Sequence, residues 1–129
     1  GKQAYLDRAM AIPAAFAADL AKNTLGHCGL IANTFDLLAP QHVVVIRTDD
    51  EVASAKLAHA MFKLSLPGAV QQVMPQSHLP QAGPLAGKTA ADGNPTAYAC
   101  IGPQCSLPIA DPEALRVFLQ AHRSIARAS

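Results

Sequence analysis

The chain has 129 residues, of which 50% are hydrophobic, and its net charge is +1. This length is enough for one domain with a real core. Because aromatic residues make up only 5% of the chain, small aliphatic side chains must build that core. The near-neutral charge gives no indication of nucleic acid or an anionic membrane as a partner. No apolar run reaches the roughly 18 residues of a membrane-spanning helix, and an odd number of cysteines favours a reducing compartment, so we expect a cytoplasmic protein.

The first third of the chain is expected to be a helical hairpin. Alanine, leucine, methionine and phenylalanine recur through residues 2–38, and no apolar segment typical of a secretion signal opens the chain. Pro13 must start a helix or kink one, because proline has no N–H and clashes with the preceding turn. Asparagine, threonine and glycine at residues 23–26 predict a break between two helices, and Pro40 ends the second.

A strand, a helix and a second strand are predicted to follow. Residues 42–47 form a short β-branched run, which is typical of a strand buried on both faces. The next helix is expected over residues 49–64, and the proline and glycine at 67–68 end that segment. Residues 69–74 are expected to form the second strand. Because the connections are short, this βαβ unit should be parallel.

The start of the predicted helix is rich in polar side chains. Thr48 and Glu51 have the spacing of a capping box, in which the threonine caps the helix and the glutamate reaches back to it. Asp49 and Asp50 lie where the positive end of the helix dipole favours negative charge. We therefore interpret these acidic residues as capping residues rather than as a catalytic or cation-binding cluster.

The next part of the chain is predicted to be a loop and a β-hairpin. Residues 75–95 are rich in proline, glycine and glutamine and form a long loop. Residues 96–101 and 104–109 alternate as two strands around a two-residue turn. One side of the hairpin is predicted to carry three facing pairs: Cys100 with Cys105, Tyr98 with Leu107, and Thr96 with Ile109. The other side carries small residues such as Ala97 and Ala99, so a helix can lie close to it.

The last helix is expected over residues 112–125. Asp111 fits the N-cap position and Pro112 fits the first helical position. Apolar residues at i, i+3 and i+4 make the helix amphipathic, and His122 follows at i+7 on the apolar face.

Together these elements predict an α/β fold. A helical hairpin at residues 1–40 packs on a small α/β domain at residues 41–129. The sheet of this domain is mixed, because it combines the parallel βαβ pair with the β-hairpin. The helices at 49–64 and 112–125 are expected to cover the sheet.

Residues 84–115 resemble the C-terminal signature of the large thioredoxin-domain-containing proteins, which include spermatogenesis-associated relatives in animals. The resemblance covers most of the chain in order, and its specific part is the last third. The matching positions are Gly87–Lys88, Asp92–Gly93, Pro95–Tyr98, Cys100, Cys105, Pro108 and Asp111–Glu113.

This resemblance implies that the chain is one part of a longer protein. Family members begin with a thioredoxin-like domain that bears a vicinal-cysteine motif, followed by an (α/α)6 barrel similar to sugar epimerases and glycosidases. Residues 1–40 resemble the end of the barrel, and residues 41–129 resemble a small α/β appendage. The resemblance thus implies a non-catalytic structural or interaction segment, whose partner is the rest of the parent protein. The loop at 75–95 would border a sugar or protein site of that parent. The isolated chain should self-associate through the helix face that the missing barrel covers.

Cys100 and Cys105 are the candidate site residues. In a two-residue hairpin they form a non-hydrogen-bonded pair, whose Cβ atoms lie near the separation that a disulfide needs. Three interpretations remain open: two buried structural thiols, a stable disulfide, or a thiol–disulfide redox pair. No Lys, Arg or His occurs within the hairpin to stabilise a thiolate.

No other catalytic residue, metal ligand or cofactor is predicted. His27 and Cys28 are adjacent and would point about 100° apart on a helix, so they cannot easily bind one metal ion together. The tripeptide at 87–89 lacks the first glycine of a phosphate-binding loop, where Ala82 stands, and we expect a solvated turn with Lys88 exposed. The other histidines are scattered, and no serine has the context of a hydrolase nucleophile.

Overall fold

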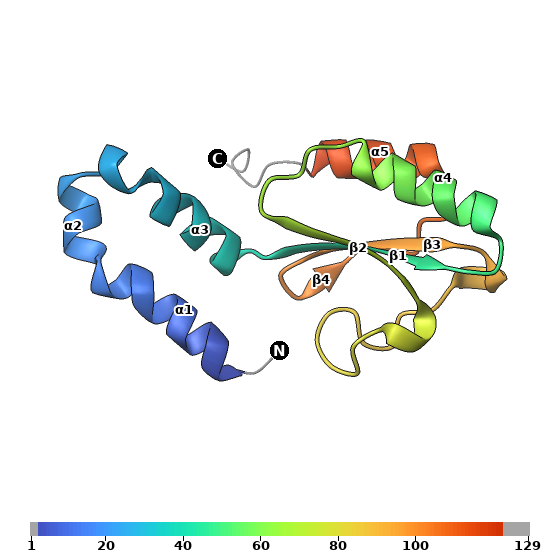
Figure 1. Ribbon diagram of the computed structural model, residues 1–129, viewed down its shortest axis with the longest axis horizontal. Helices are drawn as coiled ribbons and strands as arrows, with labels where there is room; N and C mark the ends of the chain where they lie inside the picture. Colours follow the sequence, from blue (N-terminus) through green and yellow to red (C-terminus); the bar gives the residue numbers. More distant parts are fainter. Residues whose placement is uncertain (1–2, 123–129) are drawn as a thin grey trace. The chain divides into compact units, whose positions relative to one another are not determined.

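The computed structural model describes residues 3–122, and the chain divides into two compact units, residues 1–40 and residues 41–129. The first unit is formed by the helices α1 (Gln3–Ala15), α2 (Ala17–Lys22), η1 (Leu25–His27) and α3 (Cys28–Leu38). Helix α1 packs against α3 (Figure 1), so the predicted helical hairpin is confirmed. The break between α2 and α3 falls at residues 23–27, where η1 lies, and it includes the residues 23–26 that the sequence indicated.

Two local features shape this hairpin. Pro13 lies inside α1, and the helix is interrupted shortly afterwards at Phe16, whose φ of −99° and ψ of 8° are not helical. At the turn, the side-chain oxygen of Asn23 accepts a hydrogen bond from the backbone N–H of Gly26 at 2.9 Å. A Cβ atom at Gly26 would lie 2.3 Å from the Asn23 amide nitrogen, so a larger residue would displace the Asn23 side chain from this bond.

The second unit is an α/β domain with a four-stranded sheet in the order β2-β1-β3-β4. Its elements are β1 (Gln41–Arg47), α4 (Glu51–Phe62), β2 (Ala69–Pro75), η2 (Gln76–His78), η3 (Ala91–Gly93), β3 (Thr96–Ile101), β4 (Gln104–Cys105) and α5 (Pro112–Ala121). Strands β1 and β2 are parallel, and the other neighbours are antiparallel. The predicted fold class is therefore confirmed: N-terminal helices, a mixed sheet made of a βαβ unit and a β-hairpin, and a C-terminal helix.

One face of the sheet is covered by helices. Helices α4 and α5 lie side by side on this face (Figure 1) and contribute to the main core cluster. The cluster combines Val43, Val45, Ala97 and Ala99 of the sheet with Leu57, Met61, Leu115 and Leu119 of the helices. The small side chains of β3 leave room for the helices to approach closely. The predicted helix-facing side of the hairpin is thus confirmed for Ala97 and Ala99.

The opposite face of the sheet is covered by the long loop between β2 and β3 (Figure 1). A second core cluster contains Val44, Ile46, Tyr98 and Cys100 of the sheet together with Leu79 and Leu85 of the loop. Both loop leucines are buried. The two helices therefore cover one face only, and the segment predicted as an irregular loop supplies the cover of the other.

The start of α4 differs from the prediction. Asp50, not Thr48, is the N-cap, because its carboxylate accepts a hydrogen bond from the backbone N–H of Ala53 at 2.9 Å. The backbone of Thr48 instead bonds to the hydroxyl of Ser54, and the Thr48 hydroxyl oxygen is buried with no hydrogen-bond partner among the described residues. Because Asp50 is the cap, α4 begins at Glu51, and it ends at Phe62. The helix is therefore shorter at both ends than the predicted 49–64.

Beyond its turn, the predicted pairing of the β-hairpin is wrong. Strand β4 ends after two residues, and Ile109 pairs with Ala97 instead of Thr96. Pro108 has no N–H for the ladder, and one extra residue on this side shifts the alternation of side chains. Ile109 consequently packs on the helix-covered face. Leu107, predicted to face the aromatic residue of β3, lies outside the strand and is 84% exposed.

The C-terminal helix begins as predicted. The Asp111 carboxylate accepts a hydrogen bond from the backbone N–H of Ala114 at 2.7 Å, and Pro112 follows in the first turn. His122, predicted on the apolar face, is exposed, and its ring stacks on that of Phe118. The predicted continuation to residue 125 lies outside the described residues. Within residues 3–122, no helix is long and apolar enough to cross a membrane.

Candidate functional site

The β-hairpin brings Cys100 and Cys105 together as a disulfide. Gly102 in the turn has a φ of 55°, which glycine adopts without strain. The cysteines pair across the two strands with 3.9 Å between their Cα atoms, and their Sγ atoms are bonded. The sequence left three interpretations of this pair open. The structure excludes the first of them, two free buried thiols, because the two sulfur atoms are bonded. The third cysteine, Cys28, is exposed and has a free thiol.

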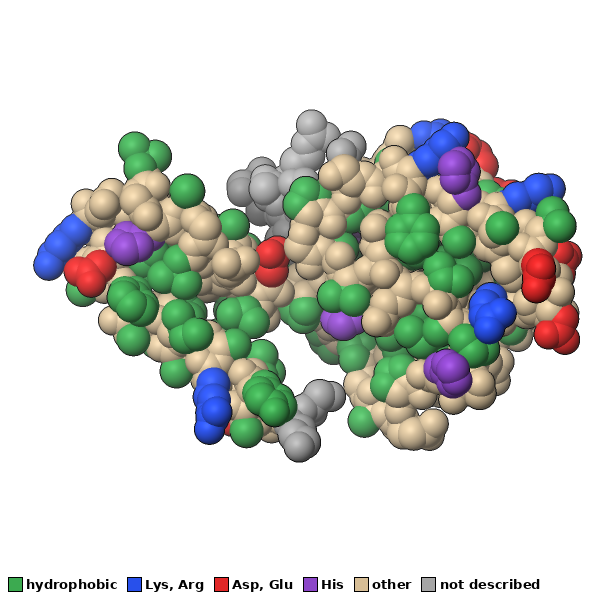
Figure 2. Space-filling view, in the orientation of Figure 1, with side chains coloured by type: hydrophobic (Ala, Val, Ile, Leu, Met, Phe, Trp, Pro, Cys, Tyr) green, Lys and Arg blue, Asp and Glu red, His purple; other side chains and the backbone are tan. Residues whose placement is uncertain are grey.

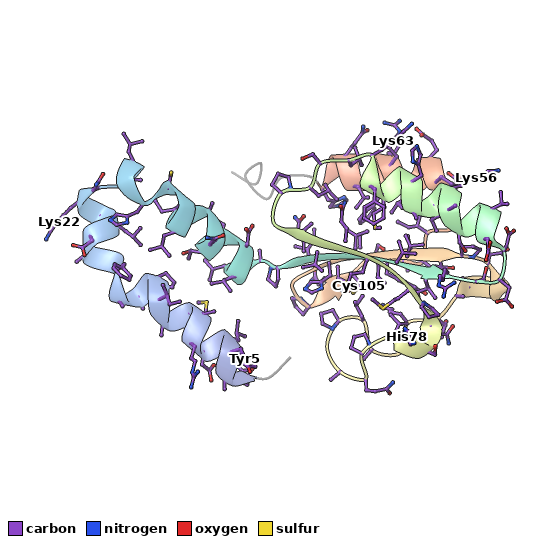
Figure 3. The ribbon with its side chains drawn as sticks, viewed as in Figure 1. Tyr5, Lys22, Lys56, Lys63, His78 and Cys105 are labelled. Atoms are coloured by element: carbon purple, nitrogen blue, oxygen red, sulfur yellow. A yellow bond between two sulfur atoms is a disulfide. The ribbon has the colours of Figure 1, made fainter. Side chains whose placement is uncertain are left out.

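The two bonded cysteines differ in exposure. Cys100 lies in the inner strand β3 and is 1% exposed, whereas Cys105 lies in the edge strand β4 and is half-buried. Figure 3 shows Cys105 on the loop-covered side of the sheet. Its Sγ atom lies 3.2 Å from the carbonyl oxygen of Pro84 in the loop. A disulfide sulfur carries no hydrogen, so this is a packing contact and not a hydrogen bond.

The sheet register places His42 beside Cys100. Strand β1 runs antiparallel to β3, and His42 is the direct partner of Cys100 across the two strands. In β1, Val43 and Val45 face the helices, whereas Val44 and Ile46 point to the loop-covered face. Val44 and Ile46 pack there in the same cluster as Cys100. The half-buried His42 side chain therefore projects from that face too. One row of residues crosses the sheet here: Val70, His42, Cys100 and Cys105.

The covering loop adds a second basic side chain to this face. The Nζ atom of Lys88 lies 4.9 Å from the centroid of the Tyr98 ring, which is a cation–π contact. Tyr98 packs in the same cluster as Cys100, and its hydroxyl donates a hydrogen bond to the carbonyl oxygen of Thr89 at 2.9 Å. Lys88 is half-buried, so the prediction of an exposed side chain in a solvated turn is wrong.

Sequence reasoning found the cysteine pair but missed the basic residues that the fold brings to it. The β-hairpin itself contains no basic residue. His42 comes from β1, and Lys88 comes from the loop between β2 and β3. A signal was present for His42, because it begins a buried strand, but its place beside Cys100 depends on the pairing of β1 with β3. Among the described residues, no group of three His, Cys, Asp or Glu side chains could hold a metal ion.

The helical hairpin presents a different kind of surface. None of residues 3–40 is buried. Its large exposed apolar side chains are Tyr5, Leu6, Met10, Ile12, Phe16, Leu25, Phe35 and Leu38. Figure 2 shows hydrophobic side chains along α1 and α3. A shallow hollow between α2 and α3 is lined by Leu20, Ile31, Thr34, Phe35 and Leu38. Apolar side chains gathered in this way are typical of a surface that another protein segment covers.

Comparisons with known protein families, with curated proteins and with solved structures find no match for this chain. The resemblance of residues 84–115 to the thioredoxin-domain-containing family therefore depends on the motifs alone. Those motifs lie in defined places of the fold: the cysteines pair in the β-hairpin, and Asp111 caps α5.

Proposed function

We propose that this chain is the non-catalytic C-terminal structural and interaction segment of a larger thioredoxin-domain protein. The observation that carries the proposal is the helical hairpin, in which none of residues 3–40 is buried. The α/β unit, in contrast, has two core clusters and a cover on each face of its sheet. Taken by itself, the hairpin leaves its apolar side chains without the cover that both faces of the α/β sheet have.

The energy of folding supports this division of roles. Fixing the backbone of one residue costs about 1 to 2 kcal/mol, and burial of apolar surface must offset that cost. Phe35 and Leu38 on α3 are 65% and 62% exposed, so the hairpin gains little from its own packing. We propose that the occupant of this surface is the remaining helices of the barrel implied by the family resemblance.

The test uses the isolated chain, in which self-association should replace the missing helices. We expect sedimentation velocity to show association that rises with protein concentration. The double substitution Phe35→Gln and Leu38→Gln should shift the chain towards the monomer. The matched control is Leu107→Gln, which removes an apolar side chain of equal or greater exposure from the α/β unit and should associate like the wild type.

Two outcomes would count against this proposal. A wild-type chain that stays monomeric over the whole concentration range, with a hairpin that resists proteolysis, would show that the hairpin packs within its own chain. Equal loss of association in the hairpin variant and in the Leu107→Gln control would place the contact elsewhere.

A second candidate function is thiol–disulfide exchange through Cys100 and Cys105. The specific observation in its favour is that the bonded pair has one half-buried member, Cys105, at the edge of the sheet. Mass spectrometry after native alkylation tests it, since Cys28 should label directly and the pair only after mild reduction. If the pair is labelled only when reductant is added in denaturant, the bond is a permanently buried structural one, which would count against exchange.

A further inference from the structure

We infer that exchange at this disulfide has a direction: an incoming thiolate attacks Cys105, and His42 stabilises the thiolate that leaves on Cys100. This inference depends on the second proposed function, exchange at the Cys100–Cys105 pair. The reductant belongs to the class of dithiols, in which one partner molecule carries both thiols. The side chain that acts on the leaving sulfur is that of His42.

The row of residues across the sheet determines which sulfur is open to attack. Displacement at a disulfide sulfur proceeds in line with the S–S bond, from the side opposite the leaving sulfur, so access to that side decides the outcome. Cys105 lies in the edge strand β4 and is half-buried, with the Pro84 carbonyl oxygen of the covering loop 3.2 Å from its Sγ atom. Cys100 lies in the inner strand β3 beside His42 of β1 and is 1% exposed. Cys105 is therefore the more accessible sulfur and Cys100 the leaving one.

The leaving thiolate is formed beside a group that can carry positive charge. A nearby imidazolium lowers the pKa of a thiol, and a thiol of lower pKa leaves faster. On the other side of His42 the row continues to Val70, which carries no charge. Among the described residues, the other ionisable groups on this face are Tyr98 in β3 and Lys88 above its ring. From α5, His122 lines a small hollow together with Cys100. The covering loop also carries His78 and Asp92 in its 3-10 helices.

The exchange balances in two steps with a dithiol as reductant. In the first, the reductant thiolate bonds to Cys105 Sγ, the S–S bond breaks, and its electron pair goes to Cys100 Sγ as a thiolate. In the second, the other thiolate of the reductant attacks the reductant sulfur of the mixed disulfide and releases the Cys105 thiolate. The reductant becomes a disulfide, and the two cysteines of this chain become thiols after protonation.

The test compares His42→Gln with a matched control, His59→Gln, both in a Cys28→Ser background that removes the free thiol. His59 is exposed on α4, which covers the opposite face of the sheet. The rate at which dithiothreitol reduces the Cys100–Cys105 disulfide is measured from about pH 5 to about pH 8. Samples taken over time are alkylated rapidly to count the free thiols. We expect His42→Gln to react severalfold more slowly at low pH, because the leaving thiolate loses its cationic neighbour. The difference should be smaller at about pH 8 than at about pH 5, because imidazole side chains carry less positive charge at higher pH, and the control should follow the wild type.

A rescue variant separates charge from packing. His42→Lys keeps a positive charge at about pH 8, so it should be reduced faster there than His42→Gln. Glutathione, a monothiol, should form its trapped mixed disulfide on Cys105, as peptide mapping will show. A wild-type disulfide that dithiothreitol does not reduce under native conditions overturns exchange itself. Reduction of the wild type with a mixed disulfide on Cys100, or an unchanged pH profile in His42→Gln, overturns the directional role and leaves exchange standing.

Discussion

The hydroxyl of Tyr98 donates a hydrogen bond to the carbonyl oxygen of Thr89 at 2.9 Å, and this bond fastens the covering loop to β3. Tyr98→Phe keeps the ring and removes the bond, so we expect a loss of about 1 kcal/mol in the free energy of unfolding. Amide hydrogen exchange should accelerate around Thr89 and remain unchanged in α4. Tyr5→Phe, at a position that is 68% exposed, is the control. Uniform acceleration over the whole α/β unit would contradict a local fastening.

The cap of α4 gives a prediction with a neighbouring control. Asp50→Ala removes the acceptor for the Ala53 N–H and should lower the free energy of unfolding by about 1 kcal/mol. Asp49→Ala removes the same charge one residue earlier without removing the cap, so its effect in urea unfolding should be clearly smaller. Equal effects of the two variants would mean that charge at the helix end, rather than the hydrogen bond, stabilises this turn.

The Cys100–Cys105 bond should stabilise the α/β unit to a modest extent. A disulfide that closes so short a loop is expected to contribute about 2 kcal/mol in the chain-entropy description. Urea unfolding of the Cys28→Ser chain with and without reductant measures this difference. In the chain that also carries Cys100→Ser and Cys105→Ser, reductant should have no effect. A reductant effect that persists in this variant would show that the measured change does not come from the disulfide.

The surface pair Glu113 and Arg116 gives a prediction about pH. The Nε atom of Arg116 lies 2.7 Å from a Glu113 carboxylate oxygen, and this hydrogen bond holds the pKa of Glu113 below its usual range. A lowered pKa in the folded state means that the contribution to stability is present above the pKa of the unfolded chain. It is lost as the pH falls through the pKa of the folded chain. Because both side chains are exposed, the effect on stability should be small. NMR titration should show the Glu113 pKa rising in Arg116→Gln, and an unmoved pKa would contradict the pairing.

Some of these features follow from local sequence and others from pairing over a distance. The β-branched run at 42–47, the turn that pairs the cysteines, and the Asp111 cap each have a signal within a few residues, and the structure contains all three. The sequence predicts Thr48 as the cap and Asp50 is observed, because α4 begins at Glu51, later in the chain than the sequence indicated. The exact end of a helix is the feature that a sequence pattern defines least well.

The environment of the candidate site could not be predicted in the same way. His42 meets Cys100 only because β1 pairs with β3, and nothing in either segment specifies that register by itself. Ile109 pairs with Ala97 instead of Thr96 because there is one extra residue in the second strand, near Pro108. A prediction from strict alternation of side chains cannot include such an extra residue. Lys88 reaches Tyr98 from an irregular segment that has no repeating pattern to interpret.

The shortness of β4 has a consequence for any protein that recognises the disulfide. The strand has two residues, and Ser106 already directs its N–H inwards to Ala99, at 2.8 Å. Pro103 and Pro108 on either side have no N–H to offer. A foreign strand laid along this short border would find few main-chain donors, among them the outward N–H of Cys105, so β-augmentation here should be weak. We therefore expect a partner of Cys105 to approach with a loop or a helix tip and to owe its selectivity mainly to side chains.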